Sequence, residues 1–245
     1  MNNDTVLVLD FDGVICDGLN ECLLSSWNTW YELGVADFSE DTLSHIPQAF
    51  TKCFTLVRNF VRHSGHFVVP FVMEGMVFAS AREFESAYEQ ITAETARRFL
   101  SGLEHYRRQI IKERKETWLR MHHFFDGMEG VLRNRLEKLY VVSGKDLPSI
   151  KCLLESKGIE LPTDHIYASQ RSKLAALHGI KKQEGIDAKQ LVFCDDNFSN
   201  MQEAKREGFS ALWADWGYQT SEDRERAKAS GISAVSLREF VERFH

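Results

Sequence analysis

Proline and cysteine are both scarce in this chain of 245 residues, which contains four prolines and five cysteines. No proline-rich linker, low-complexity stretch or internal repeat interrupts the sequence. The cysteines are odd in number and none is closely paired with another. The pattern therefore favours reduced cytosolic thiols over a disulfide framework or a zinc site.

Long apolar runs and an excess of positive charge are absent as well. No stretch reaches the roughly 18 apolar residues that a membrane-spanning helix needs, and the amino terminus lacks the features of a signal peptide. The net charge of −6 argues against a general nucleic-acid binder, although it does not exclude a local basic pocket. With 43% hydrophobic and 27% charged residues, the composition is that of a globular protein. We expect it in the cytoplasm, with neither nucleic acid nor a membrane as partner.

Near its start the sequence has the stretch 5–9, Thr followed by an apolar run of Val and Leu, and then Asp10, Asp12 and Gly13. An uninterrupted run of Val and Leu predicts a strand buried on both faces, as in a parallel sheet. Ligands bind beyond the carboxyl ends of such strands, and side chains two positions apart point to the same side. Two adjacent carboxylates repel unless a cation or a shared proton relieves them, and Mg²⁺ prefers carboxylate oxygens. The pattern predicts a Mg²⁺ site, with a plain acidic turn as the alternative.

From about residue 130 the pattern alternates between apolar strands and amphipathic helices. Strands are predicted at 139–142, 166–167, 190–194 and 211–213, and helices at 131–136, 148–156, 173–180, 199–207 and 236–244. Such alternation predicts an α/β fold, in which helices cover both faces of a parallel sheet.

Residues from about 19 to 125 instead predict helices almost throughout. Helices are expected at 21–33, 47–61 and 83–111, the last with an interruption at Gly102, and 64–70 is expected to be a loop. Arg107 and the other paired arginines of the last helix are interpreted as its solvated face. The segment is an insertion that leaves the sheet beside the two carboxylates, so we expect it to form a lid.

Three later stretches place polar residues where phosphate or metal chemistry would need them. Ser143 and Gly144 follow a strand, where a hydroxyl and backbone amides can bind a phosphate oxygen, although Ser-Gly is also a plain turn. Asp195 and Asp196 close another strand; either could cap a helix, but two acidic pairs at strand ends fit a shared cation better. Lys173, at the start of a helix, could neutralise a carboxylate or a phosphate, or be solvated.

Together these features resemble the haloacid dehalogenase superfamily, most of whose members are Mg²⁺-dependent phosphatases. The first motif is present as Asp10-Phe-Asp12-Gly-Val. Ser143 and Lys173 lie where the second and third motifs place their residues, and Asp195 matches the fourth. The first and fourth motifs are specific as a pair, whereas the other two gain meaning from their order and spacing.

The resemblance also implies a domain organisation. The segment 125–131 looks like the return of the chain from an inserted cap. The expected domains are a Rossmann-like α/β core of residues 1–16 and 125–245 and an all-α cap of the C1 type, residues 17–124.

Carried over residue by residue, the resemblance implies a role for each motif. Asp10 would be the nucleophile that becomes an aspartyl phosphate. Asp12 would act as general acid and then base, with its backbone carbonyl on Mg²⁺. Ser143 and Lys173 would hold the phosphoryl oxygens, and Lys173 would also offset the charge around Asp10. Gly144 is a substrate-binding candidate from its place beside Ser143 alone.

The metal site departs from the family pattern at one position. Asp195 would complete the Mg²⁺ site with Asp10 and Asp12. The fourth motif often carries a second Asp five residues on, where this chain has Asn200. Either Asp196 supplies the missing charge or the metal site is weaker.

The inserted segment offers candidates of its own. Arg58 and Arg62 cluster with two histidines around Gly65, where a helical cap could present them to a substrate. His63 and His66 could suggest a metal, but no third ligand is near.

The resemblance predicts an enzyme: a Mg²⁺-dependent phosphatase acting on a small phosphorylated metabolite through an aspartyl phosphate. Asp12 argues against the dehalogenase branch, which needs no acid or base there. A phosphotransferase such as a mutase is one alternative, and a non-catalytic binding or regulatory protein that keeps the fold is another. The sequence leaves the substrate and the oligomeric state open.

Overall fold

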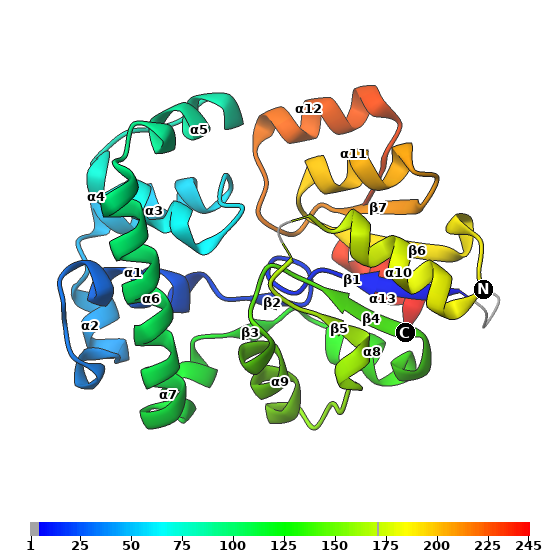
Figure 1. The fold of residues 1–245 in the computed structure, drawn as a ribbon, viewed down its shortest axis with the longest axis horizontal. Helices are drawn as coiled ribbons and strands as arrows, with labels where there is room; N and C mark the ends of the chain where they lie inside the picture. The colour runs from blue at the N-terminus through cyan, green and yellow to red at the C-terminus, as the bar shows by residue number, and fades with distance from the viewer. Residues whose placement is uncertain (1–4, 171) are drawn as a thin grey trace. The chain divides into compact units, whose positions relative to one another are not determined.

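The computed structural model describes residues 5–170 and 172–245 (Figure 1). Residues 1–4 of the predicted core lie outside the described residues. Contacts divide the chain into two units. The core unit holds the residues up to Asp17 and those from Phe124 to His245, and the helical unit holds Gly18–His123.

Among the described residues, the core unit is built on a parallel sheet of six strands in the order β5-β4-β1-β6-β7-β8. The strands are β1 (Val6–Leu9), β4 (Leu139–Val142), β5 (Ile166–Tyr167), β6 (Leu191–Asp195), β7 (Ser210–Ala214) and β8 (Ser233–Val235). Strand β1 is central: Leu7 pairs with Leu139 of β4 on one side and with Val192 of β6 on the other. The predicted α/β fold is confirmed, and every residue of β1 is buried, as its apolar run predicts.

Helices cover both faces of this sheet (Figure 1). Alternate strand residues such as Val6, Val8 and Tyr140 pack against α10 (Leu174–Glu184), α11 (Phe198–Arg206) and α12 (Ser221–Ser230). The intervening residues face the other side of the sheet, because strand side chains alternate. There α8 (Met128–Asn134), α9 (Leu147–Ser156) and α13 (Leu237–Phe244) contribute buried apolar residues. Both faces of the sheet are therefore covered by apolar side chains, and polar groups can gather at the carboxyl ends of the strands.

A short two-stranded ribbon marks where the chain leaves and re-enters the core unit. Strand β2 (Cys16–Asp17) lies beside β3 (His123–Phe124), and the Phe125 amide donates a hydrogen bond to the carbonyl of Ile15.

The helical unit is built around one long helix. Helix α6 (Ala93–Glu113) packs against α1 (Leu19–Trp30) and against the 3₁₀ segment η2 (Ser64–Val68). The other elements are η1 (Val35–Asp37), α2 (Glu40–His45), α3 (Gln48–Arg58), α4 (Val69–Val72), α5 (Ala81–Glu89) and α7 (Lys115–Arg120). Trp27 and Trp30 join an aromatic cluster with Phe50 and Phe71. No helix of the described residues is both long and apolar enough to cross a bilayer.

Three expectations about the helical unit were wrong in detail. Residues 64–70, predicted as a loop, form η2 and the start of α4 around the buried Phe67. The predicted helix 83–111 is two helices, because the Thr92 hydroxyl accepts a hydrogen bond from the Thr95 amide and starts α6 there. Gly102 does not interrupt α6; a Cβ at this position would lie 3.1 Å from Thr29 of α1, so the glycine permits close helix packing.

In the core unit, α12 and β8 were not predicted. Helix α12 buries only Asp223 and Ala227, so it carries no apolar stripe. Strand β8 is three residues long with only Val235 buried. Neither element carries the periodic pattern on which the prediction depends.

Candidate active site

Asp10 lies at the carboxyl end of the central strand. Its amide donates to the Cys194 carbonyl at 3.0 Å, which continues the pairing of β1 with β6. One carboxylate oxygen, Oδ1, accepts a hydrogen bond from the Phe11 amide at 2.7 Å. The chain then turns sharply at Gly13, whose φ of 85° is in the left-handed region. A Cβ at Gly13 would lie 2.0 Å from an Asp196 oxygen, so the turn also brings backbone against the second acidic pair.

Lys173 connects the two strand ends electrostatically. It directly precedes α10 and is buried. Its Nζ lies 2.6 Å from Asp10 Oδ2 and 2.7 Å from Asp195 Oδ2. Burial lowers the pKa of Lys173, but the two carboxylates outweigh that effect and raise the pKa above its ordinary value. The ammonium group is therefore charged and holds both aspartates.

The negative charge of Asp10 is disfavoured by its surroundings. Burial, together with the repulsion of Asp195, raises the pKa of Asp10 from 3.8 to about 6. The Lys173 ammonium and a hydrogen bond from Ser143 lower the pKa but do not cancel the rise. Asp10 is thus an ionised yet poorly neutralised carboxylate at neutral pH, as a nucleophile needs to be.

Asp195 ends β6 and Asp196 follows it, and the two residues differ in their surroundings. Asp195 is fully buried; its Oδ1 accepts from the Asn197 amide at 2.7 Å and its Oδ2 from the Asn200 side chain at 2.8 Å. Asp196 Oδ2 accepts from the Tyr218 amide at 2.7 Å. Asn200 therefore holds Asp195 from the position where the family pattern has a second Asp.

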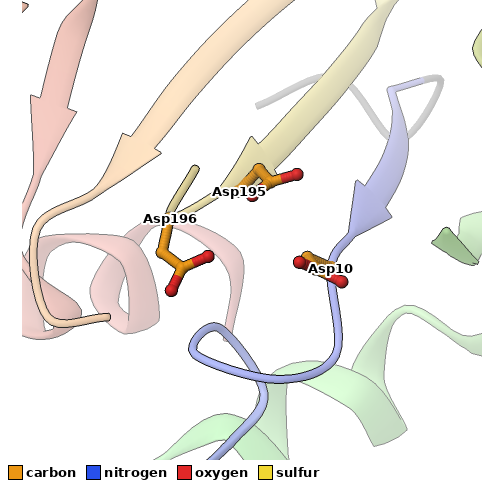
Figure 2. Close-up of side chains that lie close together, drawn as sticks. All are labelled: Asp10, Asp195 and Asp196. Atoms are coloured by element: carbon orange, nitrogen blue, oxygen red, sulfur yellow. The ribbon is translucent and has the colours of Figure 1, made fainter. Parts of the chain in front are cut away.

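Three carboxylates converge at these strand ends, as Figure 2 shows: Asp10, Asp195 and Asp196. One oxygen of each carboxylate lies within 4.8 Å of the others. Among the described residues, this is the only cluster of three or more Asp, Glu, His or Cys side chains close enough together to hold a metal ion. Asp12 has a different neighbour: Lys145 Nζ lies 3.2 Å from Asp12 Oδ1 and 3.5 Å from Oδ2.

Lys145 was missed by the sequence reasoning. It lies two residues after Ser143, on the loop that ends β4, and its side chain is 8% exposed. The Lys145 amide donates to the Ser143 hydroxyl at 3.2 Å, so the same turn positions both side chains. A lysine within a strand-end turn that already carries Ser143 and Gly144 was the available signal.

The donor set fits a divalent cation. Four carboxylates (Asp10, Asp12, Asp195 and Asp196) and two ammonium groups (Lys145 and Lys173) meet here, which leaves two negative charges in excess when all four carboxylates are ionised. All available donors are oxygens, the atoms that Mg²⁺ prefers, and a charge of +2 would cancel the excess.

The remaining candidates lie in the helical unit. Arg58 is buried with its guanidinium over the Phe67 ring. The Arg62 amide donates to Nδ1 of His66, whose ring packs against that of His63 in a tilted arrangement, with centroids 3.8 Å apart and an interplanar angle of 51°. Burial, with the charges of His63 and Arg62, lowers the pKa of His66 to about 3. These two histidines are part of a packed aromatic cluster.

Comparison with known proteins gives likeness in structure and none in sequence: no family model and no curated protein matches the chain. A haloacid dehalogenase-like family hydrolase from Streptococcus pneumoniae superposes with a TM-score of 0.62 at 15% identity, covering 100% of both chains. A protein described as a predicted phosphoglycolate phosphatase from Haemophilus somnus gives 0.65 at 15% identity, covering 99% of this chain and 97% of its own. A structure described as a predicted phosphatase from Clostridium acetobutylicum gives 0.60 at 16% identity, covering 97% and 96%.

These likenesses extend over nearly the whole chain, so they include the inserted helices as well as the sheet. They show that the chain has the fold of the haloacid dehalogenase-like hydrolases.

Proposed function

We propose that this protein is a Mg²⁺-dependent phosphatase that hydrolyses a small phosphorylated metabolite through an aspartyl phosphate on Asp10. The observation that carries the proposal is the position of Asp10 at the end of the central strand. There its carboxylate lies 2.6 Å from Lys173 Nζ, beside two further carboxylates. In this proposal the helical unit, Gly18–His123, serves as the cap.

The first half of the reaction transfers the phosphoryl group to the protein. An oxygen of Asp10 attacks phosphorus, and the bond from phosphorus to the ester oxygen breaks. Asp12 gives its proton to that oxygen, so the product leaves as an alcohol. Lys173 and the Ser143 hydroxyl lie beside Asp10 and donate to the phosphoryl oxygens as charge develops on them.

The second half releases phosphate. Asp12, now ionised, takes a proton from a water molecule as that water attacks phosphorus, and the bond from phosphorus to Asp10 breaks. Lys145 lies against the Asp12 carboxylate and holds it at the end of the loop. Inorganic phosphate leaves, and Asp12 is protonated for the next cycle.

Asp10 and Asp196 would hold the Mg²⁺, with Asp195 beside them and the Asp12 carbonyl as a further oxygen. The ion supplies positive charge that offsets the repulsion between these carboxylates and the phosphoryl group. Asp195 already accepts hydrogen bonds from Lys173, Asn197 and Asn200, and its part is to fix Lys173.

A panel of phosphomonoesters, assayed for inorganic phosphate with Mg²⁺ or with EDTA, tests the proposal. Wild type should release phosphate only with Mg²⁺, and Asp10→Asn should lose at least about 10³-fold in kcat, because an amide is a poor nucleophile. Asp164→Asn, an exposed aspartate of the same unit, is the matched control and should keep full activity. If Asp10→Asn retains more than about a tenth of the activity, Asp10 is not the nucleophile. Transfer of phosphate to an acceptor without free phosphate would favour the mutase alternative.

A further inference from the structure

The loop that follows β7 contacts residues 10–17, which follow β1 and which we name the first-motif loop, and both loops approach the Asp196 carboxylate. We name residues 215–218 the strap. It begins one residue after Ala214, the end of β7, and belongs wholly to the core unit. Neither the motifs nor the roles described above include the strap.

Tyr218 makes two hydrogen bonds to aspartates that are distant in sequence. Its backbone amide donates to Asp196 Oδ2 at 2.7 Å, and its phenol donates to Asp17 Oδ1 at 2.5 Å. Asp17 is the last residue of the core unit before the chain enters the helical unit. The side chain of Tyr218 is thus anchored at one end of the first-motif loop, while its backbone holds a carboxylate of the candidate metal site.

Gly217 shows how closely the strap approaches this carboxylate. A Cβ at Gly217 would lie 2.3 Å from Asp196 Cβ, 2.7 Å from its Oδ2 and 2.5 Å from the carbonyl oxygen of Gly13. These distances leave no space for a methyl group, and the Gly13 carbonyl is backbone that cannot rotate away. The strap and the first-motif loop therefore enclose Asp196 from two sides.

Two tryptophans hold the backbone of the first-motif loop and of Asp196. The Trp216 indole donates to the carbonyl of Val14 at 3.1 Å and packs against Phe240 of α13, with ring centroids 5.5 Å apart. The Trp213 indole, on β7, donates to the backbone carbonyl of Asp196 at 2.7 Å. Asp196 is therefore held at its backbone by β7 and at its carboxylate by the strap.

We propose that the strap is a positioning device for the metal site, in which the Tyr218–Asp17 hydrogen bond aims the Tyr218 amide at Asp196 and so sets the affinity for Mg²⁺. One oxygen of Asp196 is fixed by the amide, which orients the carboxylate toward Asp10. The outer partners of metal-binding carboxylates typically change metal affinity about 10- to 100-fold when they are removed. Tyr218 is a positioning residue because it acts through Asp196.

The inference rests on the Mg²⁺ site of the proposed function, so its test measures metal binding without catalysis. Mg²⁺ is titrated into the full-length protein by calorimetry, and the rise in Tm with Mg²⁺ concentration is followed in parallel. Gly217→Ala should raise the Kd for Mg²⁺ about 10- to 100-fold, because the methyl group displaces Asp196. Tyr218→Phe keeps the amide and removes only the anchor, so a smaller rise, of about 3- to 10-fold, is expected.

Matched controls remove the same groups elsewhere in the core unit. Tyr140→Phe removes a phenol that donates to Glu184, and Gly179→Ala adds a methyl group whose nearest neighbour is 3.9 Å away. Both should bind Mg²⁺ as wild type does. Asp17→Ala should match Tyr218→Phe, and the double variant should bind no more weakly than either single one, since all three break one interaction.

The possible outcomes separate this inference from the proposed function. Unchanged Kd values in Tyr218→Phe and Gly217→Ala, with wild type binding Mg²⁺, overturn the strap's role and leave the phosphatase intact. A lower Tm in EDTA for Tyr218→Phe with an unchanged Kd means a merely structural tyrosine and also overturns it. Recovery of wild-type kcat by Tyr218→Phe at saturating Mg²⁺ supports positioning, because the reacting groups are untouched. If wild-type protein binds no Mg²⁺, both proposals fail together.

Discussion

The core unit and the helical unit both bury charged side chains, but they balance the charges differently. In the helical unit Glu21 is 1% exposed and is paired with Arg107, which donates to Oε1 at 2.8 Å and to Oε2 at 2.7 Å. The Ser25 hydroxyl donates to the same carboxylate at 2.7 Å. This pair is neutral as a whole, and its geometry is that of a bidentate fork.

In the core unit the charges do not cancel. Lys173 is shared between Asp10 and Asp195, and Lys145 is beside Asp12, while Asp196 completes the acidic group. Burial, with a smaller contribution from the repulsion of Asp195, raises the pKa of Asp10 to about 6, so its negative charge is costly in the folded protein. If these carboxylates served stability alone, we would expect each to be neutralised by a cationic side chain, as Glu21 is by Arg107. A bound cation would neutralise this excess and allow an anionic phosphate ester to approach, so the imbalance distinguishes a site from a structural ion pair.

Among variants that test this difference between the two units, the largest expected effect is on the rate of phosphate-ester hydrolysis. Asp12→Ala should lower kcat/KM for an alkyl phosphate about 10²- to 10⁴-fold, because an alkoxide leaves poorly without a proton. The loss should be smaller for p-nitrophenyl phosphate, whose leaving group needs little protonation in the first step. Steady-state assays with both esters in saturating Mg²⁺ measure the difference, with Asp164→Ala as the surface control. Equal losses on both esters would remove Asp12 from protonation of the leaving group.

The next effect is on the stability of the helical unit. Arg107→Ala should lower the free energy of unfolding by about 3–5 kcal/mol, because it leaves the Glu21 carboxylate buried without its partner. Arg98→Ala is the matched control on the same helix. Its side chain is 80% exposed beside Glu32, so the expected change is within about 1 kcal/mol. Urea denaturation of both variants measures the difference, and equal losses would mean that burial does not distinguish the two pairs.

The sequence predicted most of the core unit because its central strands are apolar, and β1, β4 and β6 end at or directly before a recognisable polar residue, Asp10, Ser143 or Asp195. Val6–Leu9 and Leu191–Asp195 lie next to each other in the sheet. Asp10 and Asp195 therefore come together, as two acidic strand ends suggest. Lys173 was expected to neutralise a carboxylate, and it contacts two. Adjacency of strand ends is a property of parallel topology, so it can be inferred before any side chain is placed.

The missed features depend on contacts between distant residues. Arg107 was interpreted as solvated, which was wrong: its side chain is 16% exposed because it reaches Glu21 on another helix. Tyr218 and Asp17 are 201 positions apart, and no local pattern indicates that they meet. Lys145 lies in a predicted turn, but its direction toward Asp12 follows from the turn's geometry. Hydrophobic periodicity indicates which face of a helix or strand is buried. It does not indicate which charged side chain forms an ion pair or hydrogen bond with which distant residue.

The smallest expected effect is a pair of opposite pH dependences, one in each unit. In EDTA, Asp10 has a pKa of about 6 in the folded protein against an ordinary 3.8, so between these values the folded state binds more protons than the unfolded one. Its contribution to stability therefore falls as the pH rises from about 4 to about 6. His66 has a pKa of about 3 against 6.5, so the unfolded state binds more protons below 6.5. Its contribution falls as the pH drops.

Urea denaturation of Asp10→Asn and His66→Asn at pH values from 5 to 7 separates the two terms. Relative to wild type, Asp10→Asn should gain about 1–2 kcal/mol of stability as the pH rises across this range, because it lacks the carboxylate that ionises at a cost. Relative to wild type, His66→Asn should gain a similar amount as the pH falls, since the unfolded variant has no imidazole at this position to protonate. The asparagine oxygen at position 66 can accept the Arg62 amide in place of Nδ1, which keeps the local hydrogen bond. Parallel curves for wild type and both variants would show that neither group is held away from its ordinary pKa. Addition of Mg²⁺ should reduce the pH dependence of stability that Asp10 causes and leave that of His66 unchanged. The reason is that only the acidic cluster of the core unit carries excess negative charge for the ion to neutralise.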